Sequence, residues 1–391
     1  MPRKTIVIIG SSIAGLSAAE AARAQDPACD IIILSEDSFL PYYRQRLCEA
    51  LEDPSKAEKL SIHPKEWYEA QRFDLRLNHK VSGILPDEKA VVLWDGGRIQ
   101  YDRLILATGS TSFVPPIKGS DLPGVVTMWT MADTLEIELM ISGAHRSIVI
   151  GGGLLGLEAA DVLHRRGLES YILERLPRLM MRQLDERSAE LFTARVEREG
   201  THVTTDAMIA EIYADAAGRA AGVRLEDGSE FPADLIFISA GVRARIEYLE
   251  GSDVQADRFI QVDKYMRTNV RDIFAAGDCA SMEGRWYGLW PIARLEGAVA
   301  GENAAGGDKE CVMKVPPYVV KTMGTQIASA GMVDETALPR EALEQLQKDI
   351  MENSELFQYA KKLYIGDTLS GFVLLGDTKA FSSLSRQLGE R

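Results

Sequence analysis

Two similar glycine-rich loops, 141 residues apart, constrain the fold of this chain more than any other feature of its sequence. Residues 8–20 and 149–161 align without a gap, and each stretch places a loop between a β-branched run and an alanine-rich segment. The run is typical of a strand covered on both faces, and the segment after the loop favours a helix. A bound dinucleotide needs this arrangement, because its pyrophosphate must approach the backbone closely at the start of a helix. The duplication therefore predicts two dinucleotide sites.

The second loop matches the full pattern G-x-G-x-x-G, and the first loop departs from it at one position. A strand over residues 147–150 and a helix over residues 157–166 flank the second loop, which is the context that gives the pattern its meaning. The first loop has Gly10 and Gly15 but carries Ser12 where the second glycine belongs. A small hydroxyl side chain there still lets a phosphate approach, although the match is weaker.

A carboxylate follows the second expected strand of each unit, namely Glu36, which comes 21 residues after Gly15, and Glu174. At that place a carboxylate accepts hydrogen bonds from ribose hydroxyls. Alone, Glu36 would be a solvated acid at a strand end, so its role depends on the loop. Glu174 would repel a 2′-phosphate, which favours NADH over NADPH, but Arg175 and Arg178 lie close enough in sequence to meet such a phosphate.

The chain is too long for one hydrophobic core, because 391 residues suit two or three domains. Turn-rich segments near residues 115–119 and after residue 240 indicate where the chain crosses between the two units. Strand-like runs at 315–320 and 371–375 indicate a small third domain. The expected fold is α/β, with two Rossmann-like dinucleotide-binding domains and a small C-terminal α+β domain. The expected boundaries are 1–115 with 241–310 for the first domain, 116–240 for the second and 311–391 for the third.

Charge and apolar patterning indicate a cytoplasmic protein that does not act on nucleic acids or membranes. The formal net charge of -14 disfavours attraction to nucleic acid or to an anionic membrane surface. The first residues contain no signal-peptide core, and no apolar run reaches the length of a membrane span. Four cysteines lie far apart, without the C-x-x-C spacing of a local redox disulfide or a metal site, so we expect no metal.

Three further segments resemble those of the FAD- and NAD-dependent pyridine nucleotide oxidoreductase family. Residues 101–110 are similar to the segment that crosses between its two nucleotide domains, and residues 268–279 to its second flavin segment. Residues 288–293, followed by Glu296 and Gly297, resemble the segment that lies along the flavin ring. The tail and residues 41–47 are most like NADH:rubredoxin reductases and the N-terminal part of NADH nitrite reductase large subunits.

The resemblance implies that the first loop binds FAD and the second binds NADH. In the family, Asp278 would hold the ribityl chain, Arg44 would lie near the flavin pyrophosphate, and Trp290 would lie beside the ring. Trp290 as an unrelated core residue is the alternative. The residues expected to bind FAD are Gly10, Ser11, Ser12, Ala14, Gly15, Glu36, Arg44, Val81, Ala107, Thr108, Gly109, Asp278, Trp290, Pro291 and Ile292. Those expected to bind NAD are Gly151, Gly153, Leu154, Leu155, Gly156, Glu158, Glu174 and Gly241.

The expected chemistry is hydride transfer from NADH to N5 of the flavin, a matter of positioning that needs no protein acid or base. Pro291 suits the first turn of a helix that runs to about residue 303. The amides of residues 291–293 would then face the flavin pyrimidine and stabilise negative charge there. Glu158 would lie near the nicotinamide, where it either contacts the carboxamide or caps the helix.

Several fates for the electrons stay open. The resemblance favours a small iron protein such as rubredoxin as the acceptor, and an acidic partner would need a local basic patch. An NADH oxidase or a coenzyme A disulfide reductase would instead use Cys48 as a redox thiol, against a plain packing role for that residue. A flavoprotein that senses NADH without rapid turnover is the third alternative, and the chain is either a monomer or a homodimer. The candidate basic residues are Arg44, Arg46, Arg285 and Arg294.

Overall fold

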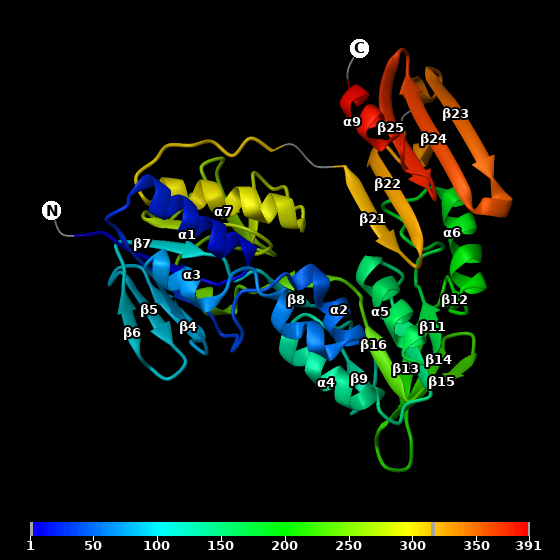
Figure 1. The fold of residues 1–391 in the computed structure, drawn as a ribbon, viewed down its shortest axis with the longest axis horizontal. Coiled ribbons are helices and arrows are strands. Elements are labelled where there is room, and N and C mark those ends of the chain that lie inside the picture. Colours follow the sequence, from blue (N-terminus) through cyan, green and yellow to red (C-terminus); the bar gives the residue numbers. More distant parts are fainter. Residues whose placement is uncertain (1–2, 314–316, 339, 390–391) are drawn as a thin grey trace. The chain divides into compact units, whose positions relative to one another are not determined.

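The computed structural model describes residues 3–313, 317–338 and 340–389 (Figure 1). These residues divide into two compact units, and each unit contains one of the two glycine-rich loops. The first unit comprises residues 3–112, 129–131 and 241–313, and the second comprises 113–128, 132–240, 317–338 and 340–389.

A five-stranded parallel sheet forms the centre of the first unit, in the order β19-β7-β1-β2-β3. Its apolar strands are covered on both faces, which explains why the predicted runs lack polar alternation. Strand β1 is the β-branched run that ends directly before Gly10 of the first loop. The bounds are β1 (Thr5–Ile9), β2 (Asp30–Leu34), β3 (Phe73–Arg76), β7 (Arg103–Leu106) and β19 (Ile273–Ala275).

Two helices, α1 (Ile13–Gln25) and α7 (Trp290–Ala304), lie side by side in the first unit (Figure 1, blue and yellow). They approach closely because α7 presents glycine to the backbone of α1. A Cβ atom on Gly297 would lie 2.1 Å from the carbonyl oxygen of Ala14. This contact fixes the start of α7 near the first glycine-rich loop.

Smaller elements complete the first unit. An antiparallel sheet contains β4 (Val81–Leu85), β5 (Ala90–Leu93) and β6 (Arg98–Gln100). Two short pairs are β8 (Ser110–Ser112) with β17 (Val242–Ala244), and β18 (Ile260–Val262) with β20 (Ala280–Met282). The short helices are α2 (Leu47–Glu52) and α3 (Lys65–Ala70), with 3-10 turns η1 (Arg44–Arg46), η2 (Pro54–Leu60) and η3 (Glu247–Leu249).

The second unit repeats the parallel design, with the strand order β12-β11-β10-β16-β9. Its strands are β9 (Val125–Val126), β10 (Arg146–Ile150), β11 (Glu169–Leu173), β12 (His202–Thr204) and β16 (Leu235–Ile238). Its helices are α4 (Met131–Ile141), whose first residue belongs to the first unit, α5 (Leu154–Arg165) and α6 (Glu186–Arg198). An antiparallel sheet adds β13 (Ile209–Ala214), β14 (Ala220–Leu225) and β15 (Glu230–Pro232).

An antiparallel sheet from the C-terminal part of the chain belongs to the second unit, in the order β21-β22-β25-β24-β23. Residues 315 and 316 of the first predicted run, 315–320, lie outside the described part of the chain. A buried ion pair joins Lys361 on β24 to Asp185 at the start of α6, with 2.8 Å between nitrogen and oxygen. The bounds are β21 (Tyr318–Thr322), β22 (Thr325–Gly331), β23 (Leu346–Asn353), β24 (Gln358–Ile365), β25 (Thr368–Leu375), η4 (Glu335–Ala337), η5 (Ser354–Leu356), α8 (Arg340–Leu343) and α9 (Phe381–Gln387).

The α/β class with two dinucleotide-binding folds is confirmed. The contacts group the C-terminal sheet with the second loop, while the three predicted domain boundaries stay a prediction. Within the described residues, every helix is too short or too polar to cross a bilayer.

Candidate functional site

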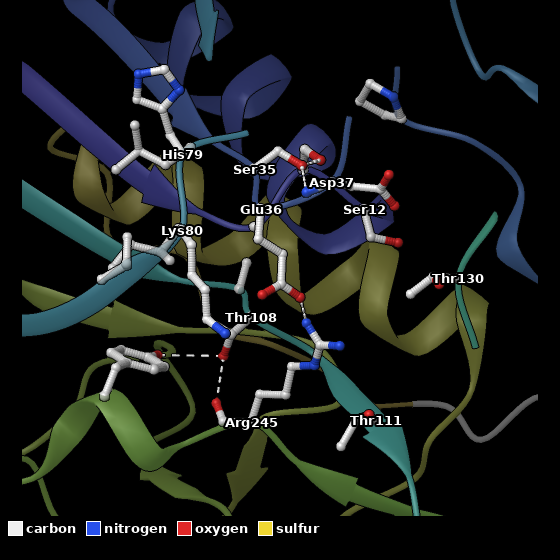
Figure 2. A pocket seen from close by; sticks show the side chains of 18 of the residues that line it. Ser12, Ser35, Glu36, Asp37, His79, Lys80, Thr108, Thr111, Thr130 and Arg245 are labelled. Atoms are coloured by element: carbon white, nitrogen blue, oxygen red, sulfur yellow. Dashed lines mark hydrogen bonds and ion pairs between the residues drawn. The ribbon is translucent and has the colours of Figure 1, made fainter. Parts of the chain in front are cut away.

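A pocket of about 590 Å³ opens in the first unit at the carboxyl ends of its central strands (Figure 2). Residues that follow β1, β2 and β7 line it, including Ser12, Glu36 and Thr108. Ligands of open parallel sheets bind at this edge, because the loops after neighbouring strands diverge there. The pocket therefore lies where the first glycine-rich loop predicts a dinucleotide.

Both loops make the same close backbone contacts. A Cβ atom on Gly10 would lie 2.0 Å from the carbonyl oxygen of Ala107, and one on Gly151 would lie 2.3 Å from that of Ser239. Both glycines also have positive φ, at 108° and 113°. These two positions therefore exclude any side chain, because the backbone of the neighbouring segment fills the space. The duplication read from the sequence thus extends to the contacts that build each loop.

Ser12 fits the position at which the second loop has glycine. Ser12 is the N-cap of α1, with φ −72° and ψ −171°, and Gly153 is the N-cap of α5, with φ −82° and ψ 179°. Any residue adopts such extended angles, and a Cβ atom on Gly153 would meet nothing within 4 Å. The serine therefore meets no steric obstacle from the protein at this position, and its contact with a phosphate stays a prediction.

Arg44 lines the pocket, as expected for a residue near a pyrophosphate. Its guanidinium lies over the rings of Tyr42 and Trp129, 5.4 and 5.9 Å from their centroids, and donates to the Trp129 carbonyl oxygen. Tyr42 in turn donates to Asp37 Oδ2 at 2.9 Å and accepts from the Met131 amide at 3.0 Å. This set of contacts holds a cation at the pocket in a fixed position.

Glu36 also lines the pocket, where its carboxylate pairs with Arg245 (Figure 2). Two hydrogen bonds hold the backbone of Arg245 in place. Its carbonyl oxygen accepts from Thr108 Oγ1 at 2.8 Å, and its amide donates to the Gly109 carbonyl oxygen. Burial lowers the pKa of Arg245. Sequence reasoning missed Arg245 because it follows the short strand β17 and belongs to no motif. It also missed Lys80 and Trp94, which line the same pocket.

The pocket lining contains eight of the fifteen residues predicted to bind FAD. These are Gly10, Ser11, Ser12, Glu36, Arg44, Val81, Ala107 and Thr108. The other seven lie elsewhere in the first unit, and their roles stay predictions: Ala14, Gly15, Gly109, Asp278, Trp290, Pro291 and Ile292.

Asp278 and Glu296 are buried carboxyl groups close to the start of α7. Asp278 accepts a hydrogen bond from Ser110 Oγ at 2.9 Å, and burial raises its pKa. Glu296 is 4% exposed and accepts from the Gly277 amide at 2.8 Å. Burial, together with the nearby charge of Asp278, raises the pKa of Glu296 to about 8. Glu296 is therefore predominantly protonated at neutral pH.

Replacing Glu296 with glutamine is expected to stabilise the flavin-free protein at alkaline pH. The folded chain holds a proton on Glu296 up to pH of about 8, whereas the unfolded chain releases it near its ordinary pKa of 4.5. Wild-type stability therefore falls as pH rises between these values, by on the order of a few kcal/mol, and E296Q avoids this loss. Urea unfolding at pH 5.5 and 8.5 measures the difference. E302Q on the same helix should keep the wild-type slope, and an equal slope in E296Q would contradict the prediction.

Helix α7 begins as the sequence predicted, with proline in its first turn. The first amides of a helix have no partner within the helix, so this end offers hydrogen-bond donors. Trp290 Nε1 is buried without a hydrogen-bond partner among the described residues, and its ring lies 6.1 Å from that of Tyr43. The unpartnered indole N–H, together with the close backbone contact at Gly10 (the glycine cradle), fits a flavin dinucleotide bound in the first unit.

In the second unit, Glu174 is bonded directly to the glycine-rich loop. Its Oε2 accepts from the Gly152 amide and its Oε1 from the Leu176 amide, both at 2.6 Å. Arg178, which the sequence left as a partner for a phosphate, forms an ion pair with Asp334. Arg175 is exposed. The carboxylate of Glu174 is therefore the charged group that is hydrogen-bonded to the second glycine-rich loop.

Glu158 lies on α5, and Tyr318 on β21 is near it. Burial and the charge of Glu158 raise the pKa of Tyr318, and its hydroxyl is buried without a hydrogen-bond partner among the described residues. No motif pointed to Tyr318. Gly241 comes two residues after Ser239, whose carbonyl oxygen packs against Gly151, and its contact with NAD stays a prediction.

The cysteines and the candidate docking arginines have different surroundings. Cys48 lies on α2 and is 9% exposed, outside the lining of the pocket. Cys279 is fully buried, and burial raises its pKa to about 11, as expected of a packing residue. Arg46 pairs with Glu49 at 2.7 Å, whereas the other two docking candidates outside the pocket, Arg285 and Arg294, are exposed. In the described residues no group of three or more metal-ligating side chains comes together.

Two parallel-sheet units with matching phosphate loops, one of them with a pocket that fits a flavin dinucleotide, define the class of FAD-dependent NAD(P)H oxidoreductases. Residues 4–297 match the model of the pyridine nucleotide-disulphide oxidoreductase family, and the chain belongs to this family.

Relatives with assigned names agree with this class. The chain is 28% identical to NADH-rubredoxin oxidoreductase of Clostridium acetobutylicum, over 89% of this chain and 87% of that protein. It is 30% identical to the nitrite reductase (NADH) large subunit of Escherichia coli, over 98% of this chain and 45% of that protein. The crystal structure of the Clostridium acetobutylicum NADH:rubredoxin oxidoreductase covers 99% of this chain and 95% of its own, with a TM-score of 0.82 and 26% identity. The chain spans about half the length of the nitrate and nitrite reductase relatives that it matches.

Proposed function

We propose that this chain is an NADH-dependent flavoprotein reductase that passes electrons from NADH, through FAD, to a small redox protein such as rubredoxin. The observation that carries the proposal is the pocket at the first loop, where the glycine cradle, Glu36 and Arg44 suit the diphosphate and ribose of FAD. The similarity to NADH-rubredoxin oxidoreductase over most of both chains supports the choice of acceptor.

The residues of the first unit would hold FAD, and those of the second would hold NADH. When bound, FAD supplies the hydride acceptor and releases electrons one at a time. Gly10 and the start of α1 would bind the diphosphate, and the first amides of α7 would offer hydrogen-bond donors to the flavin ring. The loop at Gly151 binds the diphosphate of NADH, and Glu174 accepts from its ribose. NADH is preferred over NADPH because the charge of Glu174 repels a 2′-phosphate.

Electron transfer to a protein carrier agrees with the positions of the thiols. A relay through a disulfide needs two sulfur atoms close together, and the four cysteines are far apart in sequence and all buried. An acidic carrier would dock where local positive charge overcomes the net charge of -14. The exposed guanidinium groups of Arg285, in the segment before α7, and of Arg294, in the first turns of α7, provide such charge.

Steady-state assays of the FAD-loaded protein test the proposal. We expect NADH to reduce rubredoxin or ferredoxin much faster than oxygen or disulfides, with a rate that falls as salt is added. The matched variant is C48S, which should keep the wild-type rate with a protein carrier because Cys48 lies outside the pocket lining. A rate that collapses in C48S, or turnover with disulfide or oxygen alone, would contradict the proposal in favour of thiol chemistry. Absence of rapid turnover with any acceptor would favour an NADH-sensing role.

A further inference from the structure

The pocket of the first unit continues past the carboxylate that is assigned to the ribose. Residues 79–82 line it beyond Glu36, together with the aromatic side chain of Trp94. The His79 amide donates to the Ser35 carbonyl oxygen at 2.7 Å, which fixes this segment beside the end of β2. Because the base of a dinucleotide follows its ribose, this end of the pocket is where a base would lie.

Hydrogen bonds hold the backbone of Trp94 in a defined position beside residue 80. The Trp94 amide donates to the Lys80 carbonyl oxygen at 2.9 Å. The Leu93 amide donates to the Gly97 carbonyl oxygen at 2.8 Å, which closes the turn. Asp95 Oδ1 accepts from the Gly97 amide at 2.9 Å. The turn between β5 and β6 therefore presents the indole on a rigid backbone.

The indole of Trp94 is 74% exposed, although it belongs to the pocket lining. One exposed apolar side chain carries no information by itself, since such residues are common on protein surfaces. Leu139 on α4, for example, is 79% exposed. Trp94 differs because its large flat ring belongs to the lining of a pocket and has a cation, Lys80, against it.

Lys80 adds a positive charge at the same place. Its ammonium nitrogen lies 5.2 Å from the centroid of the Trp94 ring, in the range of a cation–π contact. Figure 2 shows the Lys80 side chain extending into the pocket, as Glu36 does. The pair thus combines an aromatic face with a cation, and both attract the π-system of a purine.

We propose that Trp94, with Lys80 against it, binds the adenine of FAD and covers the base from solvent. This inference rests on the proposed function, in which the pocket of the first unit holds FAD. It assigns a specificity role to the turn between β5 and β6: the chain recognises the adenosine half of the cofactor through Trp94 and thereby selects FAD over FMN.

Titration of the flavin-free protein with FAD and with FMN tests this role without any turnover. Stacking on an aromatic side chain contributes enough free energy that W94A should bind FAD roughly tenfold or more weakly. Its affinity for FMN should stay unchanged, because FMN lacks the adenosine. W94F should keep most of the affinity for FAD, since a phenyl ring also stacks. The Tm of flavin-free W94A should equal that of the wild type, because the side chain is largely exposed.

The matched control is L139A, which removes a similarly exposed apolar side chain from the second unit and should bind FAD as the wild type does. Equal FAD affinity in W94A and wild type would overturn this inference and leave the proposed function intact. Equal weakening of FAD and FMN binding in W94A would also overturn it, because the effect would then not come from the adenine. A wild-type chain that binds no FAD would overturn the proposed function and this inference together.

Discussion

Replacing Gly151 with alanine should leave the FAD in place and remove its reduction by NADH. The new methyl group would lie 2.3 Å from the Ser239 carbonyl oxygen, at a φ of 113° that alanine rarely adopts. The second loop must then shift away from the diphosphate, while the pocket of the first unit belongs to another part of the chain. We expect kcat/KM for NADH to fall by at least about 100-fold, which corresponds to roughly 3 kcal/mol of lost binding.

Stopped-flow absorbance of the FAD-loaded variant measures this effect, with dithionite as a reductant that needs no nucleotide site. G151A should bleach with dithionite and stay oxidised with NADH. The control is G143A, which places alanine at a similar φ of 97° in the second unit but meets no atom within 4 Å. If G151A were reduced by NADH at the wild-type rate, the second loop would not be the nicotinamide dinucleotide site. Loss of FAD from G151A would show that the two loops are not independent.

The parts of this molecule that could be predicted from sequence are those that local pattern decides. Strand β1 ends where Gly10 stops the apolar run, and α5 begins at Leu154, three residues before the start predicted at residue 157. The start of α7 followed from Pro291, because proline suits the first turn of a helix. The two loops could be aligned from sequence because each begins with a glycine at a positive φ, which other residues rarely adopt.

The remaining pocket residues come from segments without a local signal. Arg245 reaches Glu36 because β17 pairs with β8 across more than a hundred residues of chain. Trp94 and Lys80 meet at the pocket because the antiparallel sheet of β4, β5 and β6 is inserted between two strands of the central sheet. The raised pKa of Glu296 likewise depends on burial, which tertiary packing decides. Sequence patterns located both loops, whereas the chemistry around them required the packed structure.

Replacing Glu174 with glutamine should shift the preference of the enzyme from NADH towards NADPH. The carboxylate accepts from two amides at once, whereas glutamine accepts from only one of them and turns its NH2 group toward the other, which loosens the contact with the loop. It also removes a negative charge, and two like charges near a protein surface cost about 4 kcal/mol at 4 Å. We expect the ratio of kcat/KM for NADPH to that for NADH to rise by at least about tenfold, with a fall in the NADH value itself.

A control variant separates the effect of the Glu174 charge from the effect of the overall charge of the second unit. E169Q provides the matched control, because Glu169 lies at the opposite end of the same strand and pairs with Arg146 at 2.6 Å. Removing that surface charge should leave the preference unchanged. Arg178 forms an ion pair with Asp334, so the shift expected in E174Q does not depend on Arg178 binding the 2′-phosphate. A ratio that stays at the wild-type value in E174Q would place discrimination elsewhere, and R175A would then identify the exposed guanidinium as the group that meets the ribose.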